Sequence, residues 1–503
     1  MGLDSTAVVL QVFNEAVRAV IERPVFAGVR FGLAVHSVDL RQPVYEFNSR
    51  EIFAAASTTK ISTVTFALAL LGPGFRFRTR LVQSGELDSD GTLHGDLVLV
   101  ASGDPNLSGR VAPDDKLDFQ NIDHSIGWPK GRLVERNPLQ VIEAFAEGAR
   151  SAGIRRVTGT VLVDTHLFPE GYREPGTSTT VSPIAVNDNL IDIIVTAGSR
   201  VGERLSYRML PQCGYVRFID LATTGESGSE PALTLSGERR EPDGTWSVTI
   251  TGTVPAGTSY LARLAVESPS RFARTLLIEA LAAKGVVIEG AHFGSSVTAT
   301  PTTADAKMVF EHVSPPLSET VKVVMKVSQN LHAEMLIPVI GATLCGVRGA
   351  GAAAAGYACG AELLARWSID MTGACQGDAA GACGFFSPDF LCRFLVHVAS
   401  SDIAEPFIAS LPVMGRDGTL WDIQQASPAA GHVMAKTGTV IYDDRLHKGV
   451  CFAAKALAGY VEAKSGRRLA FTAYFANFHR AASSSLDPGQ VLGEIAAAIY
   501  EDL

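Results

Sequence analysis

The stretch FAAASTTKIS, residues 53–62, decides how the rest of the chain is interpreted. Small apolar residues give way abruptly to hydroxyl groups and an amine, and Lys60 follows Ser57 by three positions. Because residues three apart on a helix share a face, the amine can reach the serine hydroxyl and take its proton. A lysine does so only if burial or nearby positive charge lowers its pKa. The alternative is an ordinary helix start, with Ser57 as a cap and Lys60 in solvent.

Two distant segments carry residues of matching chemistry. The first, KVSQNLHAE, contains Ser328 and Asn330, and the second, VMAKTGTVI, contains Lys436, Thr437, Gly438 and Thr439. The patterns S-x-x-K, S-x-N and K-T-G, in this order, are typical of penicillin-binding proteins and class A β-lactamases. Each pattern is weak alone, but three in order, each in a suitable predicted element, favour a catalytic site over coincidence.

The chemistry of these side chains suggests a division of roles. Ser57 is the predicted nucleophile and Lys60 is its base. Ser328 can relay the proton to a leaving amine. Lys436 adds positive charge, which helps to keep Lys60 neutral and attracts an anionic substrate.

The remaining motif residues are predicted to bind the substrate. Thr437 and Thr439 offer hydroxyls to a carboxylate, and Asn330 can donate to an amide carbonyl. Gly438 has no side chain, so an extended peptide can lie against that strand edge. An oxyanion hole needs two backbone N–H donors, and those of Ser57 and Thr439 are the predicted pair.

The chain resembles the class C low-molecular-mass penicillin-binding proteins, which are serine D-alanyl-D-alanine carboxypeptidases/endopeptidases. Segments at 95–107, 182–193, 252–258, 312–336 and 411–420 carry the resemblance beyond the three motifs, so that it covers nearly the whole chain. It implies an α/β (α+β) fold, in which a penicillin-recognising transpeptidase/β-lactamase-like domain has an antiparallel sheet flanked by helices and is interrupted by β-rich inserted domains. It also implies action on peptidoglycan stem peptides outside the cytoplasmic membrane, and acylation by β-lactams.

The distribution of helix-like and strand-like patterns along the chain predicts a discontinuous catalytic domain. Helical and strand patterns occupy residues 1–75 and 306–503, whereas short β-like runs between turn signals fill residues 76–305. The inserted region is predicted to hold two smaller domains, one nested in the other at roughly 160–260. The N-terminal helix and hairpin are expected to complete one sheet with the C-terminal strands.

Two segments depart from the family pattern. DAAGACGFFSPDF, residues 378–390, stands where the family usually has a D-G-S-G-type loop, and it lacks that serine, which puts substrate contacts from this wall in doubt. A polar insert at 442–449 lengthens the hairpin after Thr439. A plain surface turn is the favoured interpretation of this insert, and a part in substrate preference is the alternative.

The composition of the chain narrows the possible partners and locations of the protein. The 503 residues carry a formal net charge of −9, which gives no basic footprint for nucleic acid. No uninterrupted apolar run reaches 18 residues, and the N-terminus has the pattern of an amphipathic helix and not of a signal peptide. The extracytoplasmic or periplasmic location therefore rests on the resemblance, and a cytoplasmic one stays open.

The seven cysteines and the acidic residues indicate no cofactor and no metal. Cys375 and Cys383 form the favoured pair if the compartment is oxidising, but buried, reduced cysteines are the simpler expectation.

Three functions are compatible with these residues. The first is a D,D-carboxypeptidase, with or without endopeptidase activity, acting on the terminal D-Ala-D-Ala of peptidoglycan peptides and inhibited covalently by β-lactams. A β-lactamase or esterase with the same Ser/Lys site is the alternative. A non-catalytic cell-wall binding protein is disfavoured because every motif residue is intact. Peripheral contact with the membrane or cell wall is a further expectation, and the oligomeric state is undetermined.

Overall fold

The computed structural model describes residues 5–126, 131–242, 245–290, 306–446 and 448–503. The chain forms two compact units. The first comprises Met1–Phe75, Leu317–Ile340 and Ala355–Leu503, and the second comprises Arg76–Pro316 and Gly341–Ala354. All of the residues predicted to form the catalytic site lie in the first unit.

The first unit contains most of the helices. Its elements, some of which reach across the unit boundaries, are α1 (Ser5–Ile21), η1 (Pro24–Phe26), β1 (Arg30–Ser37), β2 (Gln42–Phe47), β3 (Phe53–Ala54), η2 (Ala56–Thr59), α2 (Lys60–Leu71), α5 (Leu317–Lys326), α6 (Asn330–Leu344), α7 (Ala352–Arg366), β17 (Ala374–Gln376), β18 (Gly384–Phe386), α8 (Pro388–Val398), α9 (Ala404–Ser410), η6 (Gly418–Leu420), β19 (Val433–Asp444), β20 (Gly449–Glu462), β21 (Arg468–Ala476), β22 (Phe478–Ala481) and α10 (Pro488–Asp502).

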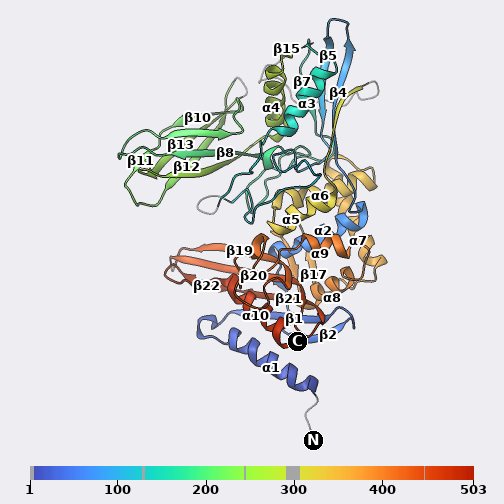
Figure 1. Ribbon diagram of the computed structural model, residues 1–503, viewed down its shortest axis with the longest axis vertical. Coiled ribbons are helices and arrows are strands. Elements are labelled where there is room, and N and C mark those ends of the chain that lie inside the picture. The colour runs from blue at the N-terminus through green and yellow to red at the C-terminus, as the bar shows by residue number, and fades with distance from the viewer. Residues whose placement is uncertain (1–4, 127–130, 243–244, 291–305, 447) are drawn as a thin grey trace. The chain divides into compact units, whose positions relative to one another are not determined.

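The main sheet of the first unit joins the two ends of the chain. Its order is β19-β20-β21-β1-β2, with β22 paired to β20, and every pairing is antiparallel. In Figure 1 the blue strands β1 and β2 lie beside the red C-terminal strands. The predicted completion of one sheet by the N-terminal hairpin and the C-terminal strands is therefore confirmed.

Strand β1 is buried on both faces because helices cover both. Phe31, Leu33 and Val35 belong to a core that also holds residues of α1 and α10. On the alternate face, a Cβ at Gly32 would lie 3.0 Å from Pro388 in α8, and Cys392 of α8 lies against the Ala34 carbonyl. His36 continues that second face by the two-residue period of a strand.

The predicted nucleophile, Ser57, lies in the short helix η2, directly before helix α2 begins at Lys60. The short strand β3 precedes it and pairs with β18, which pairs in turn with β17. The helix ends at Leu71, and Gly72 follows with φ 86°, a left-handed conformation that glycine adopts without strain.

The second unit is rich in β-structure. Its elements are β4 (Arg78–Leu87), β5 (Thr92–Val100), α3 (Gln140–Ser151), β6 (Arg156–Val157), β7 (Val161–Asp164), η3 (Asn187–Asn189), β8 (Leu190–Thr196), β9 (Ser206–Leu210), β10 (Val216–Asp220), β11 (Thr223–Gly225), β12 (Ala232–Arg240), β13 (Trp246–Pro255), β14 (Ser259–Ala265), α4 (Pro269–Ala283), β15 (Val287–Ile288), β16 (Lys307–Val313) and η5 (Gly349–Gly351).

Three sheets build the second unit. One has the order β15-β6-β5-β4-β16 with β7 beside β5, the second is β14-β8-β9, and the third is β10-β13-β11 with β12 beside β13. Strand β16 pairs with β4, so residues 307–313 belong to the second unit, whereas we expected the second part of the catalytic domain to begin at 306. The expected end of the inserted region, at 305, lies outside the described residues.

The structure also bears on cysteines and membranes. Cys375 and Cys383 carry no disulfide, so the favoured pair is not joined. Within the described ranges, no single helix is long and apolar enough to cross a membrane; only a sharply bent pair, Asn330–Leu344 with Gly349–Arg366, passes on length and composition.

Candidate active site

Ser57 and Lys60 meet in the geometry that the first motif predicts. Lys60 is fully buried, and its Nζ lies 2.9 Å from Ser57 Oγ. The same Nζ lies 2.6 Å from Asn330 Oδ1 and 2.8 Å from the carbonyl oxygen of Ala380. A neutral amine has two N–H groups and one lone pair, so it can donate to the amide and the carbonyl while it accepts the Ser57 proton. The predicted burial of Lys60 is confirmed.

A second amine and a second hydroxyl form a matching pair. Lys436 Nζ lies 2.8 Å from Ser328 Oγ and 2.8 Å from the carbonyl of Thr437. Lys436 is fully buried, and burial, reinforced by the charges of Lys60 and Lys455, holds its pKa well below the usual range. Ser328 sits between α5 and α6 with φ 66°, an uncommon conformation for a residue with a side chain.

Strand β19 supplies the third motif at the edge of the main sheet. Thr439 is exposed, and Thr437 is partly buried with its Oγ1 2.8 Å from Thr419 Oγ1. A Cβ on Gly438 would lie 2.9 Å from the carbonyl oxygen of Ala55 and 3.1 Å from Ala56 Cβ. Glycine therefore lets β19 pack against the backbone that immediately precedes the nucleophile, a reason distinct from the predicted access of a substrate strand.

The segment at 378–384 contributes its backbone where the family loop was expected to contribute a serine. Its Ala380 carbonyl is a partner of Lys60. A Cβ on Gly381 would lie 1.9 Å from the carbonyl oxygen of Ala56, and one on Gly384 would lie 2.1 Å from Thr59 Oγ1. Both glycines are thus required for this segment to approach the start of helix α2.

Two carboxylates fix the shape of that segment. Asp378 accepts hydrogen bonds from the backbone N–H groups of Gly381 and Cys383. Glu334, on α6, accepts from the N–H groups of Ala379 at 3.1 Å and Ala380 at 2.9 Å. Burial, and then the neighbouring charge of Asp378, raise the pKa of Glu334 to about 7.

Sequence reasoning missed Glu334. Glu334 accepts from the N–H of Ala380, whose carbonyl is a partner of Lys60, so a single residue connects this carboxylate to the predicted base. Its position four residues after Asn330, on the same helical face, is the signal that was available.

Lys455 is a further residue that the motifs did not reveal. It lies on β20 directly across from Thr439, and its Nζ donates to Thr439 Oγ1 at 2.9 Å. Cross-strand neighbours of a motif cannot be assigned without the strand register, which the sequence does not specify. The site thus presents a second cation beside Lys436 at the open edge of the sheet.

The hairpin that follows Thr439 is longer than a surface turn. Strands β19 and β20 stay paired through Asp444 and Gly449, so four of the eight residues of the insert at 442–449 extend the two strands, and Tyr442 pairs with Cys451. Residue 447 lies outside the described residues.

Comparison with known proteins assigns the family. Residues 13–492 match the D-Ala-D-Ala carboxypeptidase 3 (S13) family. The chain belongs to this family. It is therefore a serine-type hydrolase of the D,D-carboxypeptidase/endopeptidase group, and the prediction of a class C low-molecular-mass penicillin-binding protein is confirmed.

Individual relatives agree with the assignment. A D-alanyl-D-alanine carboxypeptidase of Actinomadura sp. (strain R39) is 28% identical over 93% of this chain and 82% of its own length. The D-alanyl-D-alanine carboxypeptidase DacB of Haemophilus influenzae is 21% identical over 95% of this chain and 91% of its own.

A solved structure agrees in fold. The crystal structure of penicillin binding protein 4 (dacB) from Haemophilus influenzae superposes with a TM-score of 0.71 at 18% identity, covering 99% of both chains. The predicted fold class is thereby confirmed.

Proposed function

We propose that Ser57 is the nucleophile and Lys60 the general base of a D,D-carboxypeptidase that cleaves the terminal D-Ala-D-Ala bond of peptidoglycan stem peptides. Ser57 Oγ attacks the carbonyl carbon of the penultimate D-Ala while Lys60 takes the hydroxyl proton. The leaving D-Ala amine receives a proton through Ser328, whose hydroxyl lies 2.8 Å from Lys436 Nζ. Water then hydrolyses the acyl-enzyme and regenerates Ser57.

Substrate recognition is assigned to the remaining motif residues. The terminal carboxylate of the peptide is placed by the hydroxyls of Thr437 and Thr439, with Lys455 supplying positive charge and the amine of Lys436 beside them as a hydrogen-bond donor. Asn330 holds Lys60 through Oδ1 and carries an amide nitrogen that can donate to a peptide carbonyl.

Backbone groups complete the assignment. Gly438 keeps β19 close to the nucleophile, and the N–H groups of Ser57 and Thr439 form the oxyanion hole.

The observation that carries the proposal is the position of Lys60 Nζ, a fully buried amine within 2.9 Å of Ser57 Oγ. A lysine with no role beyond its place in the first turn of a helix would extend into water, where its charge is solvated. Burial beside the Ser57 hydroxyl instead places the Lys60 amine where it can accept the serine proton.

A covalent-labelling experiment tests these roles. The intact mass of the protein is followed over time with a penicillin, with Ser57→Ala as control. The crystal structure of the Haemophilus influenzae protein complexed with a β-lactam supports the choice of probe. A long-lived adduct that the variant lacks supports the proposal, rapid turnover of the drug without an adduct favours the β-lactamase alternative, and absence of any acylation contradicts it.

A peptide assay separates the two peptidase activities. Release of D-Ala from a peptide with a free D-Ala-D-Ala terminus is compared with release of D-alanine amide from the amidated peptide. We expect a strong preference for the free carboxylate, because two lysines stand at its predicted position. Equal rates on both termini contradict the carboxypeptidase role and favour an endopeptidase.

The setting of the enzyme is part of the proposal. We propose that the first compact unit is the catalytic domain and that the second is the inserted region, with residues at roughly 160–260 as a nested domain. Action outside the cytoplasmic membrane follows from the peptidoglycan substrate.

A further inference from the structure

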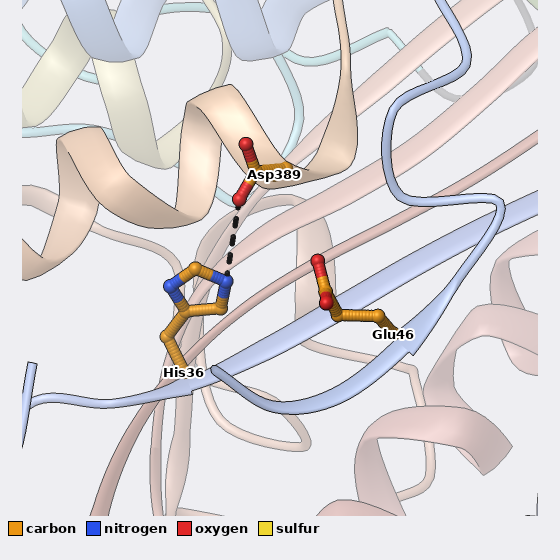
Figure 2. A group of neighbouring side chains, drawn as sticks. All are labelled: His36, Glu46 and Asp389. Carbon is orange, nitrogen blue, oxygen red and sulfur yellow. Dashed lines mark ion pairs between the residues drawn. The ribbon is translucent and has the colours of Figure 1, made fainter. Parts of the chain in front are cut away.

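Three potential metal ligands meet on the face of the main sheet that α8 covers. They are His36 on β1, Glu46 on β2 and Asp389 in the first turn of α8. One ligand atom from each lies within 4.8 Å of the other two. Figure 2 shows the imidazole of His36 facing the carboxylate of Asp389, with Glu46 beside them on the neighbouring strand.

The backbone places the three side chains on one face. His36 lies two residues after Ala34 and so points to the same side of β1. Glu46 is paired directly with Ala34 across the β1–β2 ladder, which puts its side chain on that side as well. The backbone N–H of Asp389 donates to the carbonyl of Ser49 at 2.9 Å and so ties the start of α8 to the chain just after β2.

The imidazole nitrogen that faces the carboxylates has no hydrogen-bond partner. His36 is 3% exposed, and its Nε2 is buried and unsatisfied. A buried polar atom without a partner is costly and calls for an explanation. Asp389 Oδ1, the facing acceptor, lies 3.6 Å away, which is too far for a hydrogen bond.

That separation suits two ligands of one ion. Zinc binds histidine nitrogen and carboxylate oxygen at about 2.0–2.2 Å, so neighbouring ligand atoms of a tetrahedral site lie about 3.4 Å apart.

Neighbouring groups already orient both carboxylates. Arg393 Nε donates to Asp389 Oδ2 at 3.0 Å, which leaves Oδ1 directed at His36. Ser49 Oγ donates to Glu46 Oε1 at 2.8 Å. Such outer contacts commonly hold metal ligands in place. Arg393 offsets one of the two negative charges. The cluster is therefore better suited to a transition-metal ion that bonds to imidazole than to a hard ion, such as Mg²⁺ or Ca²⁺, that depends on negatively charged oxygen ligands.

We propose that His36, Glu46 and Asp389 form a binding site for a divalent transition-metal ion of the zinc class, with water as its fourth ligand. The ion fastens the β1–β2 hairpin to the start of α8. It takes no part in the acylation of Ser57, so this proposal and the proposed function stand or fall separately.

Calorimetric titration with Zn²⁺ tests the site on the full chain after treatment with a chelator. The most informative variant is Glu46→Gln, because Glu46 is exposed and its replacement leaves the core intact. His94→Gln is the matched control: His94 Nε2 lies 3.0 Å from Asp88, but this histidine–aspartate pair is part of no three-ligand group found among the described residues.

We expect one Zn²⁺ per chain in the wild type and in His94→Gln, and an affinity lowered at least about tenfold in Glu46→Gln and His36→Gln. Zn²⁺ should also raise the Tm of the wild type and leave that of Glu46→Gln unchanged. Wild-type affinity in Glu46→Gln, or no saturable binding to the wild type, overturns the proposal. Glu46→Gln decides the outcome even if His36→Gln fails to fold.

The free cysteines require a separate control, since thiolates also bind zinc. Co²⁺ replaces Zn²⁺ as a spectroscopic probe. A site of nitrogen and oxygen ligands gives ligand-field bands without the near-ultraviolet band of thiolate-to-cobalt charge transfer. A charge-transfer band at one equivalent of Co²⁺ places the ion on cysteine and overturns the proposal.

Discussion

Each compact unit contains a cluster of buried ionisable side chains, and the two clusters differ in the charge of the groups that these side chains contact. In the first unit, the amines of Lys60 and Lys436 contact hydroxyl, amide and carbonyl oxygens, all of them neutral. In the second, Asp188 lies between two basic groups, at 2.7 Å from Arg110 and 2.8 Å from His124.

The pKa shifts of the two clusters run in opposite directions. Burial dominates for Lys436 and lowers its pKa, because the neighbouring charges are also positive. Burial alone would lower the pKa of His124 too, but the charges of Asp192 and Asp188 outweigh it and raise that pKa to about 9. Buried charges that are paired stabilise a fold, whereas a buried amine beside other cations, such as Lys436, is driven toward its neutral form.

Removing the base should give the largest effect. Lys60→Ala leaves Ser57 without a proton acceptor, and we expect acylation by penicillin to fall by about 10³-fold or more. Stopped-flow or mass-spectrometric acylation rates measure the loss, and circular dichroism verifies the fold. An acylation rate within tenfold of the wild type would contradict the role of Lys60.

Disrupting the cluster of Arg110, Asp188 and His124 should lower the free energy of unfolding and leave acylation of Ser57 unchanged. Asp188→Asn leaves Arg110 and His124 without their shared carboxylate, and we expect about 3–5 kcal/mol of lost stability in chemical denaturation. Acylation per folded molecule should stay at the wild-type rate. A stable variant with slow acylation would show that the two clusters do not have the distinct functions inferred for them.

Lys436→Ala should have an intermediate effect on catalysis. The variant removes the partner of Ser328 and one of two amines at the predicted carboxylate position. We expect a loss of about 10²-fold on peptides with a free terminus and a smaller loss on amidated ones. Steady-state kcat/KM on the two peptides checks this, and equal losses would refute a role in carboxylate recognition.

The cluster of Arg110, Asp188 and His124 also predicts that the stability of the protein depends on pH. Because the pKa of His124 is raised from 6.5 to about 9, its contribution to stability is fully present below pH 6.5 and is lost as the pH rises through 9. This contribution is on the order of 3 kcal/mol. Urea midpoints between pH 6 and 10 should therefore fall in the wild type and change less in His124→Gln. Parallel curves would refute the assignment.

The smallest effect is expected at Glu334. Its pKa is raised from 4.5 to about 7, so the protonated form is favoured in the folded protein and the stability it contributes is lost as the pH rises from 4.5 through 7. Glu334→Gln mimics the protonated acid and still accepts at Oε1. We expect acylation within about fivefold of the wild type and a flatter pH profile between 5 and 8. An unchanged profile would argue against any coupling to Lys60.

The sequence was informative where side chains carry the chemistry. Ser57, Lys60, Ser328 and Lys436 stand in recognisable local patterns, and the structure brings each amine to its hydroxyl. The shared sheet was also predictable, because alternating strands at both ends of the chain need partners.

Other parts of the site left no pattern to detect. The Ala380 carbonyl is a backbone group, which any residue supplies, and its direction depends on the turns around Gly381. Lys455 depends on a strand register. His36 and Asp389 are brought together by the packing of α8 on the sheet, and their spacing along the chain carries no signal.

The pairing of β1 with β21 also determines when the main sheet can form during translation. Arg30 pairs with Ala476, so β1 lacks this neighbour until residue 476 has been synthesised. At about 5–20 residues per second this interval is on the order of a minute. Lys436 is likewise made long after Lys60, so the proposed site stays incomplete for most of that interval. During that interval one edge of the N-terminal hairpin stays unpaired and open to wrong partners.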